Sequence, residues 1–342
     1  MEPDDGKDES SPDEEFVPAR STRDAAIGVW RIAAPAVRLA ALLLVPVLIL
    51  GIAAAQLGRD LGPSVPDLVR AAGLAGREEL VVGVLGDVPG VSLRDPDTGR
   101  FTGFDVDISY LIAADLGFLR DEVRFAVVEN EDRSRMLTHD PMLTHDEKGG
   151  FISVDLVVAG FGITAERESL PGVGFSQPYL ATEQTVVTRI GHTGVVTLGD
   201  LRTRRVCAVG ATESERLANQ SGAVVLAAAD PGECISWVLD GRVEAVVGDA
   251  AILAGFVARH RKQLMAHDIG LESTTQWGIN TGDNAALREL VDHFLARSAD
   301  DGRDDRWETA FERHFMTEQK YLPTQPIAMD RQPSLTNVEV RD

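Results

Sequence analysis

Apolar residues follow two patterns along most of the chain. Short apolar runs of the kind found in buried parallel strands occur at 80–85, 123–128, 154–159, 184–189, 204–209 and 243–247. Apolar residues at helical spacing alternate with these runs, at 104–116, from 133 onward, and at 212–219, 231–240, 249–260 and 284–296. Strands separated by helices predict an α/β fold, in which right-handed crossovers cover a parallel sheet with helices.

A different pattern occupies residues 39–55, which read LAALLLVPVLILGIAAA and contain no charged or polar side chain. A helix rises about 1.5 Å per residue, so this segment and its flanks match a bilayer core of about 30 Å. A buried helix of a soluble protein normally keeps a polar face, and this segment has none. We therefore expect one transmembrane helix over residues 36–58.

The flanking charges orient this helix. Only Arg59 follows it closely, whereas four arginines precede it, at positions 20, 23, 31 and 38. The positive-inside rule then places the N-terminus in the cytoplasm and the chain after about residue 60 outside the cell membrane. The small residues 53–55 also resemble the cleavage site of a signal peptide, so a cleaved signal is the alternative to an uncleaved anchor. The long segment before the helix favours the anchor.

Acidic residues dominate the net charge of −21, which comes from 54 Asp and Glu against 33 Lys and Arg. This balance argues against nucleic-acid binding, which needs a basic surface. Residues 1–15, MEPDDGKDESSPDEE, carry eight acids, one lysine and no apolar pattern. We expect residues 1–30 to form a disordered acidic tail on the cytoplasmic side.

Motifs for cofactor, metal or nucleophilic chemistry are absent from the sequence. It contains no P-loop, dinucleotide fingerprint, GxSxG or HExxH, and its seven histidines show no metal-ligand spacing. The pentapeptide MLTHD occurs twice, at 136–140 and 142–146, which favours a duplicated surface loop over a metal site. We therefore expect neither a cofactor nor a metal.

Seven pieces of sequence between about residues 78 and 316 carry a resemblance. They are LVVGVLGDVPG, DTGRFTGFDVDISYLIAADLG, VDLVVAGFGITAERES, VGFSQPY, LGDLRTRRVCAVGATESE, GRVEAVVGDAAILAG and QWGINTGDNAALRELVDHFL. In this order they resemble the extracytoplasmic solute-binding proteins of family 3, the polar amino-acid-binding proteins of ABC transporters. TGRFTGFDVDI, GITAER and FSQPY are specific because they occur together.

The resemblance implies a two-lobed clamp of the periplasmic-binding-protein type II class, with two hinge crossings and the membrane helix before it. The implied parts are lobe 1 at 75–182 and 280–320, lobe 2 at 183–279, hinge segments near 180–184 and 273–279, and a C-terminal tail at 321–342. Ligand would bind between the lobes and stabilise the closed arrangement, because it touches both lobes only there.

A zwitterion loses its hydration in such a site, so its carboxylate needs a fixed cation and its ammonium a fixed anion. Arg167 follows an apolar strand at the carboxyl end, where α/β sheets place their sites, and arginine binds a carboxylate at two oxygens. The resemblance assigns the α-carboxylate to Arg167 and the α-ammonium to Asp249. The simpler interpretations are a surface ion pair of Arg167 with Glu166 or Glu168, and a helix N-cap for Asp249.

The resemblance places backbone groups of both lobes around the ligand. Gly160 and Gly162 would bring the main chain of lobe 1 close to it. Ala211 and Thr212 would offer backbone N–H groups and a hydroxyl at a helix start in lobe 2. Many relatives carry serine or threonine in place of Gly162, so one hydroxyl contact is missing.

Three further residues concern the side chain of the ligand. Asp87 and Val88 stand in the loop where relatives carry an aromatic ring against the ligand, so the aromatic wall is missing or supplied elsewhere. Arg133 stands where similar proteins have an arginine before the second helix. If Arg133 faces the cleft it would bind an acidic side chain of the ligand, and otherwise it is a solvated helix charge.

Cys207 and Cys234 are the only cysteines, and relatives often carry a cysteine pair at these places. The compartment outside the membrane is oxidising, so we expect a structural disulfide within lobe 2. The loop-entropy model gives it about 3–4 kcal/mol of stabilisation.

These observations predict a membrane-anchored, extracytoplasmic amino-acid-binding protein that is not an enzyme. An ABC permease would be its partner, and a glutamate-, aspartate- or glutamine-like ligand is favoured. The alternative is a membrane-tethered amino-acid sensor that acts through a signalling partner, since a non-lipidated anchor is unusual for a transport component. A dehydratase on the same fold is a minor alternative, for which Glu213 is the candidate acid.

Overall fold

The computed structural model describes residues 42–52, 62–139, 150–192, 194–270, 274–323, 325–335 and 340. The chain divides into two units, residues 1–61 and residues 62–342. In the first unit, residues 42–52 form a helix with exposed apolar side chains. In the described part of the chain no helix is long and apolar enough to cross a membrane. The rest of the predicted membrane helix 36–58, and the whole predicted tail 1–30, lie outside the described residues.

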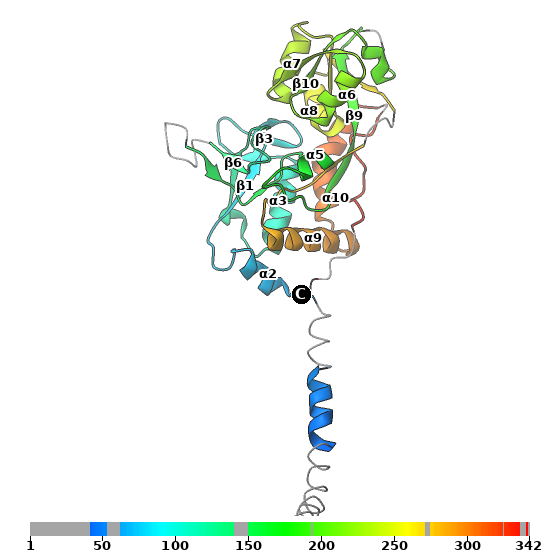
Figure 1. Ribbon diagram of the computed structural model, residues 1–342. Coiled ribbons are helices and arrows are strands. Elements are labelled where there is room, and N and C mark those ends of the chain that lie inside the picture. The colour runs from blue at the N-terminus through cyan, green and yellow to red at the C-terminus, as the bar shows by residue number, and fades with distance from the viewer. Residues whose placement is uncertain are drawn as a thin grey trace, which may run out of the picture. The chain divides into compact units, whose positions relative to one another are not determined.

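Lobe 1 is built on a short parallel sheet. β1 (Leu80–Val84) lies between β5 (Val123–Val127) and β8 (Leu156–Val157), where the first three apolar runs predicted strands. The helices of this lobe are α2 (Val65–Ala71), α3 (Phe104–Asp115), α9 (Ala285–Asp300) and α10 (Arg306–Phe311). α3 packs on β1, α9 and α10, so segments from both ends of the sequence complete the lobe (Figure 1).

Short elements surround this sheet. They are the antiparallel strands β2 (Asp87–Val88), β3 (Ser92–Arg94) and β4 (Phe101–Thr102), the pair β6 (Leu137–Thr138) and β7 (Ile152–Ser153), the 3-10 turn η1 (Arg120–Glu122) and the single-turn helix α5 (Ala165–Glu168). After α10 the chain continues through the π-helical turn η3 (Glu312–Met316) and α11 (Thr317–Gln319).

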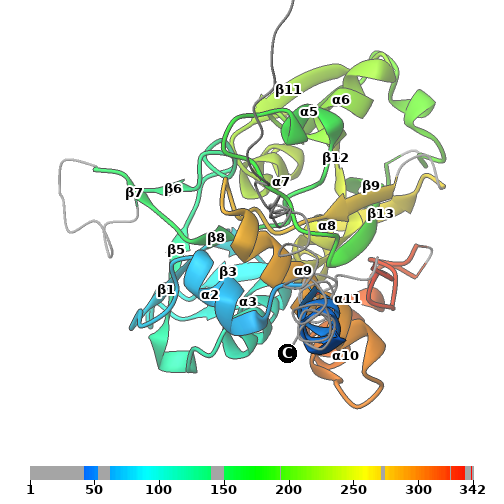
Figure 2. The same ribbon diagram turned by 60° about the horizontal axis from the view of Figure 1, so that its bottom comes forward.

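Lobe 2 holds a larger sheet. Its strand order is β11-β10-β12-β9-β13, with the bounds β11 (Val224–Ala228), β10 (Arg205–Val209), β12 (Ala245–Asp249), β9 (Leu180–Arg189) and β13 (Leu264–Asp268). Its helices are η2 (Leu198–Leu201), α6 (Glu213–Gln220), α7 (Pro231–Leu239) and α8 (Ala250–Arg259). α6 and α7 both pack on β10 and β12, and α8 packs on β9, β12 and β13 (Figures 1 and 2).

The expectation of parallel sheets throughout is wrong for lobe 2. β10 runs parallel to β11 and β12, but β9 is antiparallel to both of its neighbours, β12 and β13. The crossover helix α8 joins β12 to β13 as a right-handed crossover would join neighbouring parallel strands. β9, which enters from lobe 1, occupies the position between them and makes the sheet mixed.

The predicted helix from residue 133 onward is also wrong. Residues 131–136 form turns, and the strand β6 follows directly. Met136 has a φ of 55°, which a side chain with a Cβ adopts only at a cost and which ends any helix. The guanidinium of Arg133 also bonds back to the carbonyl oxygen of Asn130 at 3.2 Å. The apolar spacing over this stretch therefore reflects burial in a turn.

Two antiparallel strands connect the lobes at the predicted hinge segments. β9 leaves lobe 1 at Leu180, and β14 (Thr274–Trp277) pairs with its first four residues, with Thr182 opposite Thr275. A rotation of one lobe against the other therefore has to be absorbed by a paired ribbon of two strands.

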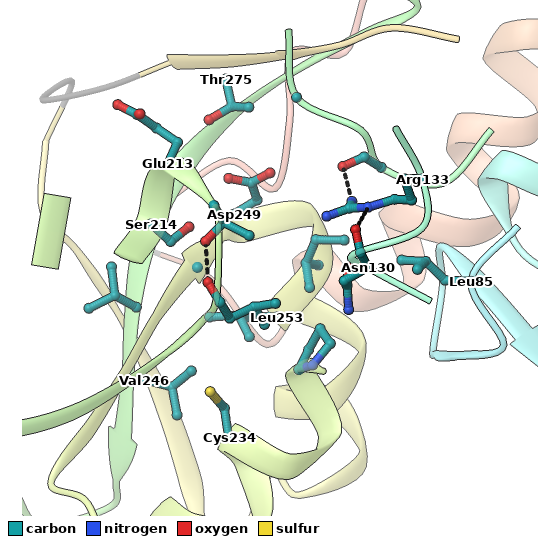
Figure 3. A pocket seen from close by; sticks show the side chains of 18 of the residues that line it. Leu85, Asn130, Arg133, Glu213, Ser214, Cys234, Val246, Asp249, Leu253 and Thr275 are labelled. Carbon is teal, nitrogen blue, oxygen red and sulfur yellow. Dashed lines mark hydrogen bonds between the residues drawn. The ribbon is translucent and has the colours of Figure 1, made fainter. Parts of the chain in front are cut away.

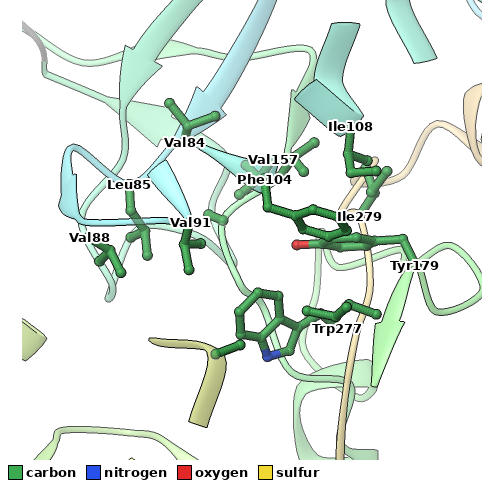
Figure 4. Close-up of a cluster of buried hydrophobic side chains, with 14 of the residues drawn as sticks. Val84, Leu85, Val88, Val91, Phe104, Ile108, Val157, Tyr179, Trp277 and Ile279 are labelled. Carbon is green, nitrogen blue, oxygen red and sulfur yellow. The ribbon is translucent and has the colours of Figure 1, made fainter. Parts of the chain in front are cut away.

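Aromatic packing fixes the end of this ribbon to lobe 1. Phe104, Tyr179 and Trp277 lie together in the core beside the apolar residues of β1 (Figure 4). Trp307 of α10 is also fully buried, and its indole N–H donates to the carbonyl oxygen of Tyr179 at 2.8 Å. The hinge therefore starts from a rigid base.

The predicted disulfide is confirmed. Cys207 on β10 bonds to Cys234 on α7, 27 residues later, and both side chains are fully buried. The bond ties a central strand of lobe 2 to a helix that lines the interlobe cavity described below.

One glycine permits the close approach of the two lobes, because a Cβ at Gly255 of α8 would lie 2.2 Å from the carbonyl oxygen of Pro89 in lobe 1. Gly255→Ala should strengthen the isolated helix by about 1 kcal/mol, yet the added methyl meets rigid backbone across the seam. We expect residues 62–342 of this variant to stay folded and to show a larger radius of gyration by X-ray scattering. Gly194→Ala, which has open space around it, is the control. An unchanged radius of gyration would contradict this contact.

Candidate functional site

A cavity of about 60 Å³ lies between the lobes. Lobe 1 and the hinge contribute Leu85, Asn130, Arg133, Gly160, Gly162, Arg167 and Thr275, and lobe 2 contributes Val209, Thr212, Glu213, Ser214, Pro231, Cys234, Val246, Val247, Gly248, Asp249, Ile252 and Leu253. Arg133 and Asn130 face Asp249 and Ser214 across this space (Figure 3). A groove of about 580 Å³ adjoins the cavity and shares Asn130, Arg167, Thr212 and Glu213 with it.

Arg167 stands at the junction of the cavity and the groove. Its helix α5 is capped by Thr164, whose hydroxyl accepts from the N–H of Arg167 at 3.2 Å. Nη1 donates to the carbonyl oxygen of Gly162 at 2.8 Å, and Nη2 reaches across the seam to that of Ala211 at 2.7 Å. The guanidinium also lies 4.8 Å from the ring centre of Phe161. The charges of Asp249 and Glu166 favour the charged form of Arg167, while its hydrogen bonds go to main-chain carbonyls and not to Glu166 or Glu168.

Asp249 ends β12 on the opposite wall. Although it occupies the N-cap position of α8, its side chain makes no capping hydrogen bond. One carboxylate oxygen accepts from the amide of Gln184, and the other accepts from the indole N–H of Trp277 at 2.8 Å. Burial raises the pKa of Asp249, while these hydrogen bonds and Arg167 favour the charged form. The carboxylate is therefore oriented by hinge residues rather than by its own helix.

Arg133 lies on the cavity wall, with its side chain buried. Its Nη1 donates to the carbonyl oxygens of Ala159 at 3.1 Å and Gly160 at 3.3 Å, and the ring centre of Phe161 lies 4.9 Å away. Burial and the neighbouring Arg167 lower the pKa of Arg133 to about 9. Two guanidiniums on one aromatic ring make this end of the cavity strongly positive.

The loop that carries Gly160 and Gly162 is held from behind by a buried carboxyl. Asp105 accepts from the N–H of Gly160 at 2.8 Å and from the hydroxyl of Tyr179 at 2.9 Å. Gly160 has a φ of 54°, a conformation that glycine adopts without strain. A Cβ at Gly162 would lie 2.8 Å from the methyl group of Thr275, so the hinge threonine occupies the space of the side chain that relatives carry there.

Ala211 lines the groove, whereas Thr212 lines both the groove and the cavity. Thr212 lines the cavity and caps α6, accepting from the N–H of Glu215 at 3.3 Å. The N–H of Ala211 donates to the Glu215 carboxylate at 2.8 Å, and its carbonyl is the one that Arg167 binds. Ala211 thus presents an acceptor toward Arg167, whereas the resemblance implied a donor for the ligand. Its φ of 57° holds the carbonyl in that direction.

Asp87 and Val88 do not line the cavity. Val88 is fully buried in the lobe 1 core, because the two-residue strand β2 turns it inward. Asp87 is exposed on β2 and lies close to Asp230 of lobe 2; partial desolvation at the seam and the charge of Asp230 raise the pKa of Asp87 to about 6. Leu85 is the residue of this region that reaches the cavity (Figures 3 and 4).

Several functional residues were missed by the sequence analysis. Gln184, Thr275 and Trp277 lie on hinge strands, and only the pairing of β9 with β14 brings them to Asp249. No local sequence pattern predicts the contact of these residues with Asp249. The sequence could have indicated that Asp105 is buried, because it is an acid beside Phe104 at the start of an otherwise apolar helix face.

Glu213, the candidate acid of a dehydratase, does line the cavity. Its carboxylate is bound by the Arg216 guanidinium one turn later, at 2.7 Å from Nε. This ion pair would have to break before Glu213 could donate a proton to a ligand.

Two α/β lobes joined by a paired ribbon, with a cation and an anion facing each other across the cavity, define a two-lobed solute-binding clamp. The family model of the bacterial extracellular solute-binding proteins, family 3, matches residues 80–315. The chain belongs to this family, which confirms the resemblance and its two-lobed α/β fold.

Several similar proteins of known function are binding proteins for amino acids. The glutamine-binding protein of a Bacillus subtilis ABC transporter is 27% identical over 238 residues, covering 68% of this chain and 81% of that protein. A glutamate-binding protein of Corynebacterium glutamicum is 29% identical over 230 residues, covering 61% and 72%. The structure of a variant of the arginine-binding protein from T. maritima superimposes with a TM-score of 0.59 at 25% identity, covering 72% and 99%.

The backbone strain at Ala211 should lower the free energy of unfolding of the protein, and its removal should raise it. A left-handed conformation costs an alanine about 1–2 kcal/mol, whereas glycine loses about 0.4–1 kcal/mol through the entropy of the unfolded chain. We therefore expect Ala211→Gly to raise the free energy of unfolding by about 0.5–1 kcal/mol in urea titrations. Ala229→Gly, also exposed and without a positive φ, should lower it. Equal losses in both variants would show that Ala211 stores no strain.

Asp105 should make stability depend on pH. Burial raises the pKa of Asp105 to about 7, well above the ordinary value of 3.8. The folded state therefore binds this proton more tightly than the unfolded state, so its contribution is fully present below about pH 4 and is lost as the pH rises to about 7. The free energy of unfolding of the wild type should fall relative to Asp105→Asn across this window. A difference that stays constant with pH would contradict the raised pKa.

Proposed function

We propose that the protein is an extracytoplasmic amino-acid-binding protein and the substrate-binding component of an ABC importer. The observation that carries the proposal is the placement of Arg167 and Asp249 on opposite walls of one interlobe cavity, each held by its own hydrogen bonds. A zwitterion offers a carboxylate to the first and an ammonium to the second, and contacts both lobes only when they are closed.

The proposed ligand has an acidic or amide side chain, as glutamate, aspartate and glutamine do. Arg133 adds a second cation beside Arg167, and Asn130 adds an amide on the same side of the cavity. Apolar side chains line much of the rest of the cavity, where the methylene groups of such a ligand would pack, among them Leu85 of lobe 1 and Ile252 and Leu253 of lobe 2. The glutamine- and glutamate-binding relatives agree with this assignment.

Entry of the ligand requires an exchange of partners at Arg167. The two nitrogens that would bind its carboxylate donate to the carbonyl oxygens of Gly162 and Ala211. The carboxylate must replace the Ala211 carbonyl, and the charge of the carboxylate makes it the stronger acceptor.

The proposal includes a membrane anchor formed by residues 36–58, with the binding domain outside the cell. Its support is the uncharged apolar run at 39–55 and the arginines that precede it. An ABC permease is the proposed partner, and a signalling partner is the alternative. Co-purification of the full chain with a permease would favour transport, and a tail modification that depends on the ligand would favour the sensor.

Calorimetric titration of residues 62–342 with the twenty amino acids tests the binding function. We expect micromolar or tighter binding of glutamate, aspartate or glutamine, and a loss of about 2–5 kcal/mol of binding free energy in Arg167→Ala, because the ligand carboxylate is left unpaired. Arg133→Gln should weaken the acidic ligands more than glutamine. Arg135→Ala removes an exposed arginine of the same lobe and should bind normally. Silence across the panel from folded protein would reject an amino-acid ligand.

A further inference from the structure

The chain beyond the family match returns to the hinge. The match ends at residue 315, whereas the chain continues through α11 and then runs back along β9. The sequence predicted only a C-terminal tail at 321–342. Residues 319–323 and 325–329 are here called the brace, and they pack between the lobes instead of extending away from them.

The brace pairs with the hinge ribbon through one antiparallel bridge. Ala328 forms an antiparallel bridge with Thr182, whose other edge pairs with Thr275 of β14. The hydroxyl of Thr182 donates to the carbonyl oxygen of Ile327 at 2.7 Å, and the N–H of Met329 donates to that of Ala181 at 2.9 Å. Both edges of β9 are therefore hydrogen-bonded at the residues where the lobes would rotate.

Two glutamines give the brace its shape. Gln319 donates to the carbonyl oxygens of Leu322 at 2.8 Å and Gln325 at 2.9 Å, and accepts from the N–H of Ile327 at 2.9 Å. The amide of Gln325, which is 2% exposed, donates to the carbonyl oxygen of Gln184 at 2.8 Å. These bonds hold a turn of fixed geometry against the hinge strand.

The brace contacts lobe 2 and is anchored on lobe 1. Arg261, which follows α8, donates to the hydroxyl of Tyr321 at 3.3 Å and lies 5.7 Å from its ring centre. Beyond the brace, Gln332 donates to the carbonyl oxygen of Leu295 on α9 at 3.0 Å. A segment fixed to lobe 1 at both ends and bonded to lobe 2 between them opposes the separation of the lobes.

The brace also touches the residue that orients the proposed ammonium site. The side chain of Gln184 donates to Asp249 and to Thr275, and accepts from Ser214 at 2.7 Å. Its backbone carbonyl is the acceptor for Gln325. The brace is therefore bonded to Gln184, the residue of the hinge strand that also contacts Asp249 in the cavity wall.

We propose that the brace is a mechanical limit on opening, which holds the lobes near their closed arrangement and restricts rotation at residues 180–184. This inference goes beyond the proposed binding function, because it concerns the motion of the lobes with or without ligand. Hinge closure normally depends on a few residues that absorb large backbone rotations, and the bridge and hydrogen bonds of the brace restrict this freedom at residues 181 and 182 of β9.

Spin-label distances between the lobes test the brace. The labels are placed on the full-length chain at Asp121→Cys of lobe 1 and Gln220→Cys of lobe 2, both exposed, while the native cysteines stay in their disulfide. In the double variant Gln319→Met and Gln325→Met, the distance distribution without ligand should broaden and shift away from that of the wild type. Gln263→Met, the same substitution at an exposed position of lobe 2, should leave it unchanged. A distribution identical to that of the wild type, with folding verified by circular dichroism, would overturn the proposal.

Hydrogen exchange on the unaltered protein is the second test, in case the double variant fails to fold. The N–H groups of Ile327 and Met329 should exchange as slowly as those of β14, because both are bonded within the brace and hinge. Exchange at the rate of an unstructured chain would overturn the brace. Neither test uses an amino acid, so the brace is tested separately from ligand binding. If the brace behaves as expected but the protein binds no amino acid, only the proposed binding function is rejected.

Discussion

A charge that leaves water must be held by partners, and this requirement organises the whole interlobe site. Arg167 and Asp249 lie on different lobes, and neither depends on the other for its hydrogen bonds. Each lobe therefore supplies one charge, and each charge has a hydrogen-bond partner on its own side, Gly162 for Arg167 and Gln184 for Asp249. A ligand with both charges replaces hydration with these preorganised groups, and the ordering cost is met in folding instead of in binding.

The supports of these charges are buried residues at some distance from the cavity. Asp105 binds the N–H of Gly160 and Tyr179 packs behind it, so the loop in front of Arg133 takes one conformation. A buried carboxyl with a raised pKa is costly to maintain when ionised, and its position is explained by the loop that it fixes. Asp105, near the start of α3, thus fixes the loop that forms the lobe 1 wall of the site.

Local sequence patterns predicted the strands β1, β10 and β12 because each holds an apolar run buried on both faces, and β5 because its residues are mostly apolar although Arg124 is exposed. Arg167 lies beyond the glycine-containing loop after β8 and Asp249 ends β12, and the family resemblance assigned their roles at these positions. The turn around Arg133 was predicted as a helix, since apolar spacing does not report the positive φ of Met136. Val88 was placed at the ligand although Leu85 takes that position, because a two-residue strand decides which side chain faces inward.

Contacts between distant segments were the part that sequence patterns did not reveal. Gln184, Trp277 and Gln325 are far apart in the chain, and they meet only because β9 is paired on both of its edges. Through Gln184, the same strand holds the Asp249 carboxylate on one side and the brace on the other. Rotation of β9 thus moves the anion of the site and the brace together. The geometry of the hinge therefore determines the orientation of the proposed ammonium site.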